Sequence, residues 1–198
     1  PGHEHTRIID GIPEGWEKKP LSYLCVDIRE SVDPQKLPSE TPYIGIEHIP
    51  RRSITLSNWS EANKIKSKKF KFLKNDILFA KIRPYFHKVG CTFMEGITSS
   101  DTIVIRPYND LYYFYCLMLC SSDEFIRLAT KTMKEGSKMP RADWKYLLDC
   151  YFIVPEEQVL TIFNTYLIPI KNQIENLVFQ NQKLSQARDL LLPRLMNG

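Results

Sequence analysis

The C-terminal quarter of the sequence carries the feature that most limits the fold, a long row of apolar residues spaced four and three apart. Such spacing puts all members of a row on one side of an α-helix and is typical of helices that pair with another helix. The only polar members are Asn181 and Arg188, and a single Asn in such a row helps to fix register and partner. The row comprises Leu160, Phe163, Leu167, Ile170, Ile174, Leu177, Asn181, Leu184, Arg188 and Leu191.

The row predicts a coiled-coil arm over residues 156–198. Its start is marked by Pro155-Glu156-Glu157-Gln158, because proline and acidic residues both favour the first turn of a helix. Pro169 interrupts the pattern, so either the arm kinks there or a short helix ends near Tyr166 and a new one begins at Pro169. We favour two helices, since proline suits a first turn.

The same row has a second interpretation, an amphipathic helix packed on its own domain. A helix of that kind shows a wider apolar stripe and is usually shorter than about 20 residues. We therefore expect helix–helix pairing, within or between chains, from Leu167 to Leu191. On this hypothesis Ile174→Asp abolishes self-association or partner docking.

Residues 1–155 form a second region, a mixed and strand-rich α+β domain with packed helices, in which residues 1–11 are a loose terminus. Short apolar runs predict strands at residues 43–46, 77–80, 102–105 and 151–154. Helices are expected over residues 111–119, entered from Asn109 or Asp110, and from a Ser121–Glu124 capping box to a stop at Gly136-Ser137. A short helix over residues 141–148 completes the domain.

Several kinds of chemistry have no signal in the sequence. There is no phosphate-binding GxxxxGK[ST] or GxGxxG motif and no HExxH, so neither a cofactor nor a metal site is predicted. Asp143-Trp144-Lys145, with Asp123 and Glu124 upstream, is loosely similar to a nuclease pattern, but helix caps explain these acids more simply. No run is long enough to span a membrane. Cys116 and Cys120 are expected to be buried free thiols, which indicates a reducing cytoplasm.

Positive charge is concentrated in residues 51–90, which hold eleven basic and two acidic residues, a balance of 11 − 2 = +9. The tail from Glu156 to Gly198 is neutral, with four of each sign. Lysines at this density supply sequence-independent contacts to phosphates. Residues 64–72 predict a loop that leads into a strand, with Phe70 and Phe72 inside and Lys69 and Lys71 outside.

Base reading requires arginine, serine or another polar side chain at the edge of a groove. The candidates lie in the basic stretch, in the loop at Ser99-Ser100 and in the turn that ends at Arg141. The predicted DNA-binding residues are Arg51, Arg52, Lys66, Lys68, Lys69, Lys71, Lys81, Arg83, Tyr85, Lys88, Ser99, Ser100, Ser137, Lys138 and Arg141.

Taken in order, six segments resemble one half of a type I restriction–modification specificity subunit. The closest match is the ending, from Pro155-Glu156-Glu157-Gln158 through Asn181-Gln182-Lys183-Leu184 to the last segment. The segments are residues 12–17, 75–84, 136–141, 155–158 and 181–184, and the last one is Arg188-Asp189-Leu190-Leu191-Leu192-Pro193-Arg194-Leu195.

The resemblance implies a target recognition domain over residues 12–155 and a conserved helical spacer after it. It also implies a non-catalytic role: recognition of one part of a bipartite double-stranded DNA site, and docking of methyltransferase and restriction subunits. The family normally has two recognition domains, so this chain is either a truncated half or a half-subunit that pairs with its own copy and reads a symmetric split site. The alternative is a protein-interaction adaptor that acts through the arm without reading DNA.

Overall fold

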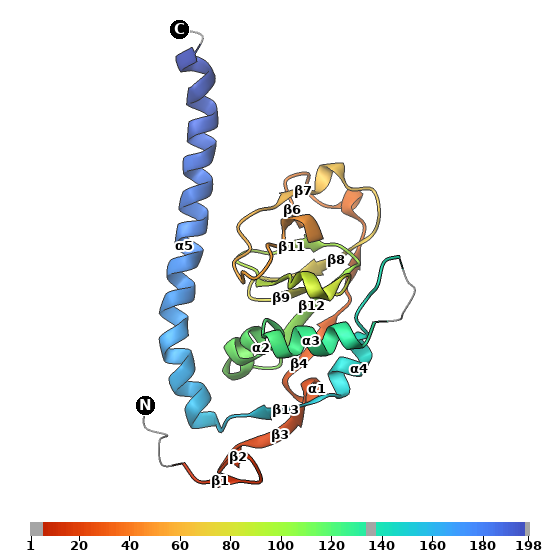
Figure 1. The fold of residues 1–198 in the computed structure, drawn as a ribbon. Helices are drawn as coiled ribbons and strands as arrows, with labels where there is room; N and C mark the ends of the chain where they lie inside the picture. Colours follow the sequence, from red (N-terminus) through yellow and green to blue (C-terminus); the bar gives the residue numbers. More distant parts are fainter. Residues whose placement is uncertain (1–5, 134–137, 197–198) are drawn as a thin grey trace.

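The computed structural model describes residues 6–133 and 138–196 of the chain. A layered domain of sheets and helices lies beside one long helix, α5 (Glu157–Met196), which runs along the domain and ends beyond it (Figure 1). The predicted α+β class, strand-rich and followed by a helical arm, is confirmed.

The centre of the domain is a four-stranded antiparallel sheet. Its order is β10 (Val89–Cys91), β9 (Ile77–Ala80), β12 (Thr102–Pro107) and β4 (Cys25–Ile28). The predicted strands at residues 77–80 and 102–105 are therefore correct. All four residues of β9 are buried, because both faces of the strand are covered by other layers.

A second sheet packs against the central one. Its order is β5 (Ser31–Val32), β8 (Lys69–Phe72), β11 (Gly96–Thr98), β6 (Pro42–Ile44) and β7 (Ser60–Glu61), and β11 runs parallel to β6. The strand predicted over residues 43–46 ends at Ile44. Ile46–His48 is a 3₁₀ turn instead, since the Gly45 amide donates a hydrogen bond to His48 Nδ1 at 2.9 Å.

The core follows from the alternation of side chains along β9 and β12. One set points toward the helices and the other toward the five-stranded sheet, which gives three layers. The first set is Ile77, Phe79, Ile103 and Ile105, and the second is Leu78, Ala80 and Val104.

The helical layer comprises α1 (Leu21–Leu24), α2 (Tyr113–Cys120), α3 (Asp123–Lys131) and α4 (Trp144–Asp149). Asn109 accepts a hydrogen bond from the Tyr112 amide, as predicted, and a 3₁₀ turn over Asp110–Tyr112 precedes α2. Cys116 and Cys120 are buried free thiols, also as predicted.

Two predicted helix starts were displaced. The cap of α3 is Ser122 rather than Ser121, because its hydroxyl accepts from the Phe125 amide at 3.1 Å. The last short helix begins at Trp144 rather than near Arg141, because Asp143 caps it through the Tyr146 amide. The stop predicted at Gly136-Ser137 lies outside the described residues, and α3 ends at Lys131.

Two small antiparallel pairs close the lower end of the domain. β3 (Glu17–Pro20) pairs with β13 (Tyr151–Val154), which confirms the predicted strand at residues 151–154. β1 (Ile8–Ile9) pairs with β2 (Ile12–Pro13) through a two-residue turn at Asp10 and Gly11. Because both turn residues adopt positive φ angles, of 50° and 76°, they suit a tight hairpin. The described part of residues 1–11 therefore supplies the first strand and the turn of a hairpin.

The arm is one continuous helix, so the prediction of two helices meeting at Pro169 was wrong. Proline removes one backbone hydrogen bond, to the carbonyl of Thr165. Both residues lie on the exposed side, where water can satisfy that carbonyl. Leu167 and Ile174 pack on the domain on either side of the proline and keep the two halves in line.

The apolar row of the arm is divided between two surfaces. Leu160, Leu167 and Ile174 pack against the helical core of the domain. Asn164 donates from Nδ2 to the carbonyls of Asp110 and Leu111, at 3.2 and 3.0 Å, and Gln182 donates to the Ser57 carbonyl at 3.0 Å. The exposed apolar members of the row, on the adjacent face of the helix, are Phe163, Ile170, Leu177, Leu184 and Leu191.

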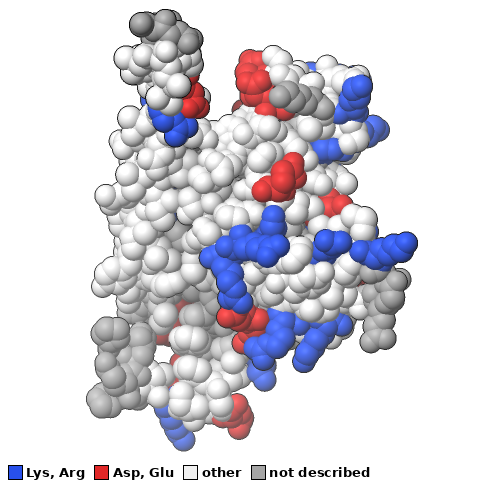
Figure 2. Space-filling model, turned by 45° about the horizontal axis from the view of Figure 1, so that its top comes forward, with Lys and Arg blue, Asp and Glu red and all other residues white. Residues whose placement is uncertain are grey.

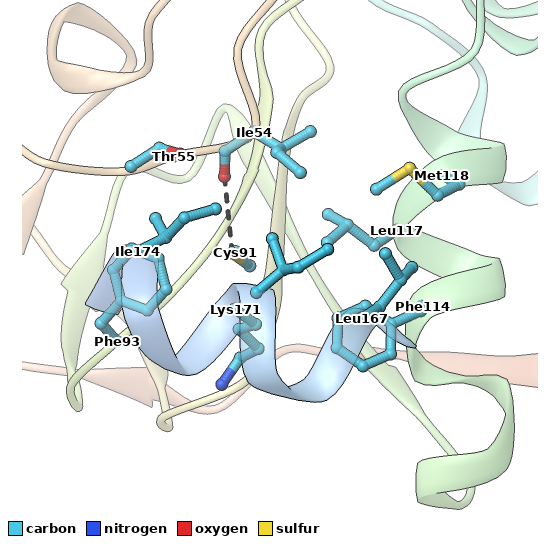
Figure 3. A pocket seen from close by; sticks show the side chains of 11 residues that line it. Ile54, Thr55, Cys91, Phe93, Phe114, Leu117, Met118, Leu167, Lys171 and Ile174 are labelled. Atoms are coloured by element: carbon cyan, nitrogen blue, oxygen red, sulfur yellow. Dashed lines mark hydrogen bonds between the residues drawn. The ribbon is translucent and has the colours of Figure 1, made fainter. Parts of the chain in front are cut away.

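A small apolar cavity of about 50 Å³ lies beneath the arm. Figure 3 shows Leu167 of α5 beside Phe114 and Leu117 of α2 on one side of it, Ile174 beside Phe93 on the other side, and Cys91 between them. The Cys91 thiol donates to the Ile54 carbonyl at 3.5 Å, and burial raises its pKa above the ordinary value. Apolar contact around this cavity holds the arm to its own domain.

We expect Ile174→Asp to lower the free energy of unfolding by about 2–4 kcal/mol, because it places a carboxylate against this apolar contact. Urea unfolding of the monomer, at a concentration where sedimentation finds no dimer, measures the effect. Leu184→Asp is the matched control, since Leu184 is 67% exposed, and should change stability by less than about 0.5 kcal/mol. Equal losses for both variants would contradict the division of the row.

Candidate nucleic-acid interface

Two loops at the ends of central strands and the segment before α4 are tied together by backbone hydrogen bonds. The Lys81 amide donates to the Asp101 carbonyl at 3.0 Å, and the Ala142 amide donates to the Lys81 carbonyl at 2.8 Å. The Arg83 amide donates to the Pro140 carbonyl at 2.8 Å. These bonds join the segments 81–83, 99–101 and 138–142, which we call the three-loop cluster. The predicted residues Lys81, Arg83, Ser99, Ser100, Lys138 and Arg141 all belong to it.

A bidentate ion pair crosses this cluster. Arg141 Nε lies 2.7 Å from Asp101 Oδ1, and Nη2 lies 3.2 Å from Oδ2. The hydrogen bonds that the Arg141 guanidinium donates to the Asp101 carboxylate raise the pKa of the guanidinium above its ordinary value. The pair fixes the orientation of an arginine at the surface of the domain.

A second basic group lies at the β9–β10 turn, next to the three-loop cluster. The Arg52 amide donates to the His87 carbonyl at 2.9 Å, and the Arg51 guanidinium stacks 4.1 Å from the centre of the Phe86 ring. Arg52, Arg83 and His87 have φ angles of 55°, 47° and 54°. Left-handed backbone at residues other than glycine is uncommon and clusters at functional sites.

Buried groups hold this turn in place. His87 is 8% exposed, and its Nε2 lies 2.6 Å from the Ser121 carbonyl oxygen. The Asp123 carboxylate accepts from Arg52 Nη1 at 2.9 Å and lies 3.4 Å from His87 Nδ1. The strained turn is therefore anchored to the start of α3.

Lys88 completes the second group from inside the same turn. Its Nζ donates to the Ile46 carbonyl at 2.6 Å. Burial lowers the pKa of its ammonium group, the charge of Arg51 lowers it further, and Glu47 partly opposes them. Positive charges thus converge where the turn meets the five-stranded sheet.

The third basic group is the run that leads into β8. Thr98 of β11 pairs with Phe70 of β8, so Ser99 and Ser100 leave the sheet beside Lys69 and Lys68. Lys66 and Lys68 are exposed and Lys71 is partly exposed. The loop-then-strand prediction for this run is correct.

Lys69 departs from the prediction, since it is 9% exposed rather than outward-facing. Its Nζ donates to the Ser67 hydroxyl at 2.5 Å and to the Ser67 carbonyl at 3.3 Å. The ammonium group also lies 5.8 Å from the centre of the Tyr43 ring. The ammonium group of Lys69 therefore makes its contacts inside the domain.

Figure 2 shows basic side chains gathered over the domain, while the visible surface of the arm is mostly uncharged. Among the predicted residues, Arg51, Arg52, Arg83, Tyr85 and Arg141 are exposed, and so are Ser100 and Lys138. Lys81, Lys88 and Ser99 are partly exposed. Ser137 lies outside the described residues. The structure thus brings three separate parts of the sequence to adjoining loops.

Sequence reasoning missed the residues that position these arginines. Asp101 and Asp123 are separated from their partners by 40 and 71 residues. His87 lies within the basic stretch but was not among the predicted residues. No local pattern signals such contacts, because they depend on which strand ends meet.

The acids considered for a nuclease have other partners. Asp143 accepts the Tyr146 amide as a helix cap, and Asp123 binds Arg52. Within residues 6–133 and 138–196, no three His, Cys, Asp or Glu side chains gather in a way that could hold a metal ion. Over the same residues, no helix combines the length and the apolar character needed to cross a membrane.

Known proteins resemble this chain in sequence and in fold. The MjaIX specificity subunit of a type I restriction enzyme from Methanocaldococcus jannaschii is 23% identical over 199 residues, which cover 94% of this chain and 45% of the relative. The crystal structure of an HsdS subunit from Thermoanaerobacter tengcongensis matches with a TM-score of 0.67 and 20% identity, over 91% of this chain and 48% of that one.

A chain from a structure on complex assembly and conformational transition of the type I R-M system matches with a TM-score of 0.65 and 20% identity. The match covers 93% of this chain and 49% of that one. This chain therefore spans about half the length of the relatives it matches. The family described as "Type I restriction modification DNA specificity domain" matches residues 13–180, most of the described structure, and the chain belongs to that family.

Proposed function

We propose that this chain is a non-catalytic DNA-reading module of a type I restriction–modification system. It recognises one part of a bipartite double-stranded DNA site and docks methyltransferase and restriction subunits. The observation that carries the proposal is the convergence of the basic groups on adjoining strand-end loops, in a chain of the DNA specificity family.

The exposed basic residues can make two kinds of contact with DNA. Exposed lysines such as Lys66, Lys68 and Lys138 supply phosphate contacts, which position a protein without reading sequence. An arginine held in a fixed orientation, such as Arg141, suits base edges in the major groove. Family membership supports this reading over an adaptor that acts only through the arm.

In this role the partner subunits catalyse the reactions, and the chain itself needs no cofactor or metal to recognise DNA. All five cysteines are free thiols, which suits the reducing cytoplasm where we place the protein. Recognition over residues 12–155 and spacing by residues 156–198 remain the proposed division of the chain.

The exposed row of the arm supports pairing with a second, antiparallel copy. Phe163, Ile170, Leu177, Leu184 and Leu191 recur every seven residues, so their order is symmetric about Leu177. In an antiparallel pair centred there, Leu177 meets its own copy and Ile170 meets Leu184. Such a homodimer presents two identical readers at a fixed separation and suits a symmetric split site.

The far end of the arm offers a further apolar surface for the other subunits. Leu190 is 68% exposed, Leu195 77% and Met196 81%. Exposed leucines gathered at a helix end favour docking of another protein. This end is the proposed contact for the methyltransferase subunit.

The proposal predicts strongly salt-dependent DNA binding. If six of the exposed basic residues contact phosphates, the logarithm of the association constant should fall with a slope of about −5 against the logarithm of salt concentration. Fluorescence anisotropy with duplex DNA between about 50 and 300 mM salt measures this slope. The dimer and the complex with the methyltransferase subunit should both be tested, and absence of binding by both at the lowest salt would favour the adaptor.

A further inference from the structure

The guanidinium of Arg141 is held so that its outer edge stays available. Asp101 contacts it side-on, through Nε at 2.7 Å and Nη2 at 3.2 Å. An arginine has five N–H donors, so this contact leaves one hydrogen on Nη2 and two on Nη1. Nη1 makes one long contact, of 3.3 Å, with the Met139 carbonyl. A parallel pair of donors therefore remains at the end of the side chain.

A contribution to the stability of the fold does not account for the ion pair between Arg141 and Asp101. The side chains of Arg141 and Asp101 are 45% and 24% exposed, and exposed ion pairs contribute little to stability. The Arg106–Asp76 pair has the same side-on geometry but a different setting. The Asp76 side chain is 2% exposed and also accepts the Leu73 amide at 2.7 Å, so that pair ties two strands together.

The surroundings of Arg141 suit a nucleic acid. Lys81, Arg83 and Lys138 belong to the same three-loop cluster and can contact phosphates on either side of a base. Two parallel donors match the O6 and N7 acceptors of guanine in the major groove, and no other base presents two acceptors on this edge. The same fork also fits two phosphate oxygens, but a phosphate contact carries no sequence preference, so selection among DNA sequences separates the two.

We propose that Arg141 reads a guanine base in the DNA target and that Asp101 is its positioning residue. The inference rests on the proposed function and adds to it the identity of one base. The side-on carboxylate fixes the guanidinium before DNA arrives, so less side-chain freedom is lost on binding. Bidentate contact then requires the planar fork of arginine, which lysine lacks.

The test is selection from a library of randomised duplex DNA, followed by sequencing, with the full chain in its assembled form. The wild-type protein should enrich a motif that contains a guanine whose preference Arg141→Lys reduces about 10-fold or more. The other positions of the motif should keep their preferences. Asp101→Asn should weaken the same position and leave the melting temperature unchanged. Arg127→Lys, at an exposed arginine on α3, is the charge-matched control and should leave the whole motif unchanged.

The outcomes separate this inference from the function on which it rests. No enriched motif with the wild-type protein would contradict the proposed function itself. A wild-type motif that Arg141→Lys leaves intact at every position would overturn the guanine contact and leave DNA reading standing. A uniform loss of affinity in Arg141→Ala, with a salt slope smaller by about 0.9, would assign Arg141 to a phosphate instead.

Discussion

If the arms pair as proposed, replacing both Leu177 and Leu184 by aspartate is expected to convert the dimer to a monomer. Both leucines are at least half exposed within one chain, so the fold itself should persist. Each dimer would lose four leucine side chains from the interface, and a buried leucine contributes about 1.5–3 kcal/mol. The dimerisation constant should therefore fall by more than about 10³-fold.

Light scattering across a concentration series measures this change, as a shift from twice 23.2 kDa to 23.2 kDa. Circular dichroism of the variant should match that of the wild type. A wild-type chain that stays monomeric at every concentration would contradict self-pairing and leave the exposed row for a different partner.

Disulfide cross-linking determines the orientation of the same pair. On a Cys150→Ser background, a mixture of Ile170→Cys and Leu184→Cys chains should form a mixed disulfide if the arms are antiparallel. Parallel arms would instead link Ile170→Cys to itself. The other four native cysteines are buried, which limits competing bonds.

Reversing charge at Arg51 and Arg83 is expected to weaken DNA binding by at least about 10²-fold at 0.1 M salt. Two lost phosphate contacts remove about 1.8 units of salt slope, which corresponds to about 60-fold at this concentration, and repulsion by the new carboxylates adds to it. Anisotropy titrations of the Arg51→Glu/Arg83→Glu variant measure the loss. Both side chains are exposed, so the melting temperature should change little.

Lys18→Glu/Lys183→Glu is the matched control for charge. Lys18 lies on β3 and Lys183 on the arm, away from the three-loop cluster, and both are exposed. This variant has the same net charge as the first. If the two variants lose affinity equally, binding depends on overall charge and not on the strand-end loops.

The central strands could be predicted from the sequence because their short, wholly apolar runs are typical of buried strands. Ile77–Ala80 is apolar throughout, as a strand buried on both faces must be. The caps of α3 and α4 were misplaced by one to three residues because several neighbouring side chains can accept the same amides. Ser121 and Ser122 are equally able to cap a helix, and tertiary packing selects between them.

The sequence could not predict how the arm divides its apolar row. At about 100° per residue, the set Leu160, Leu167 and Ile174 lies only about 60° around the helix from the set Phe163, Ile170 and Leu177. A heptad pattern therefore fits either one wide interface or two adjacent ones. Only the position of the domain beside α5 separates them, and that depends on contacts such as Asn164 with the Leu111 carbonyl.

The candidate site was predicted in composition but not in geometry. The basic stretch and the Arg141 turn were identified by residue type, whereas the ion pair of Arg141 with Asp101 spans 40 residues. Lys69 was expected to face outward on strand alternation, yet the local acceptors of Ser67 hold its ammonium group inside. Residue type indicates what a side chain can do, and topology determines whether it is free to do so.

The burial of β9 on both faces has a consequence for how such a domain can diversify. Ile77–Ala80 are fixed by packing on two sides, while Lys81 to Arg83, directly after them, stand on a loop. Substitutions of the Lys81 and Arg83 side chains leave the packed strand and the buried Ile82 untouched, so new side chains can be tried at these two positions with little loss of stability. The domain can therefore change its preferred DNA target through substitutions in its loops, while the packed strands that position these loops stay the same.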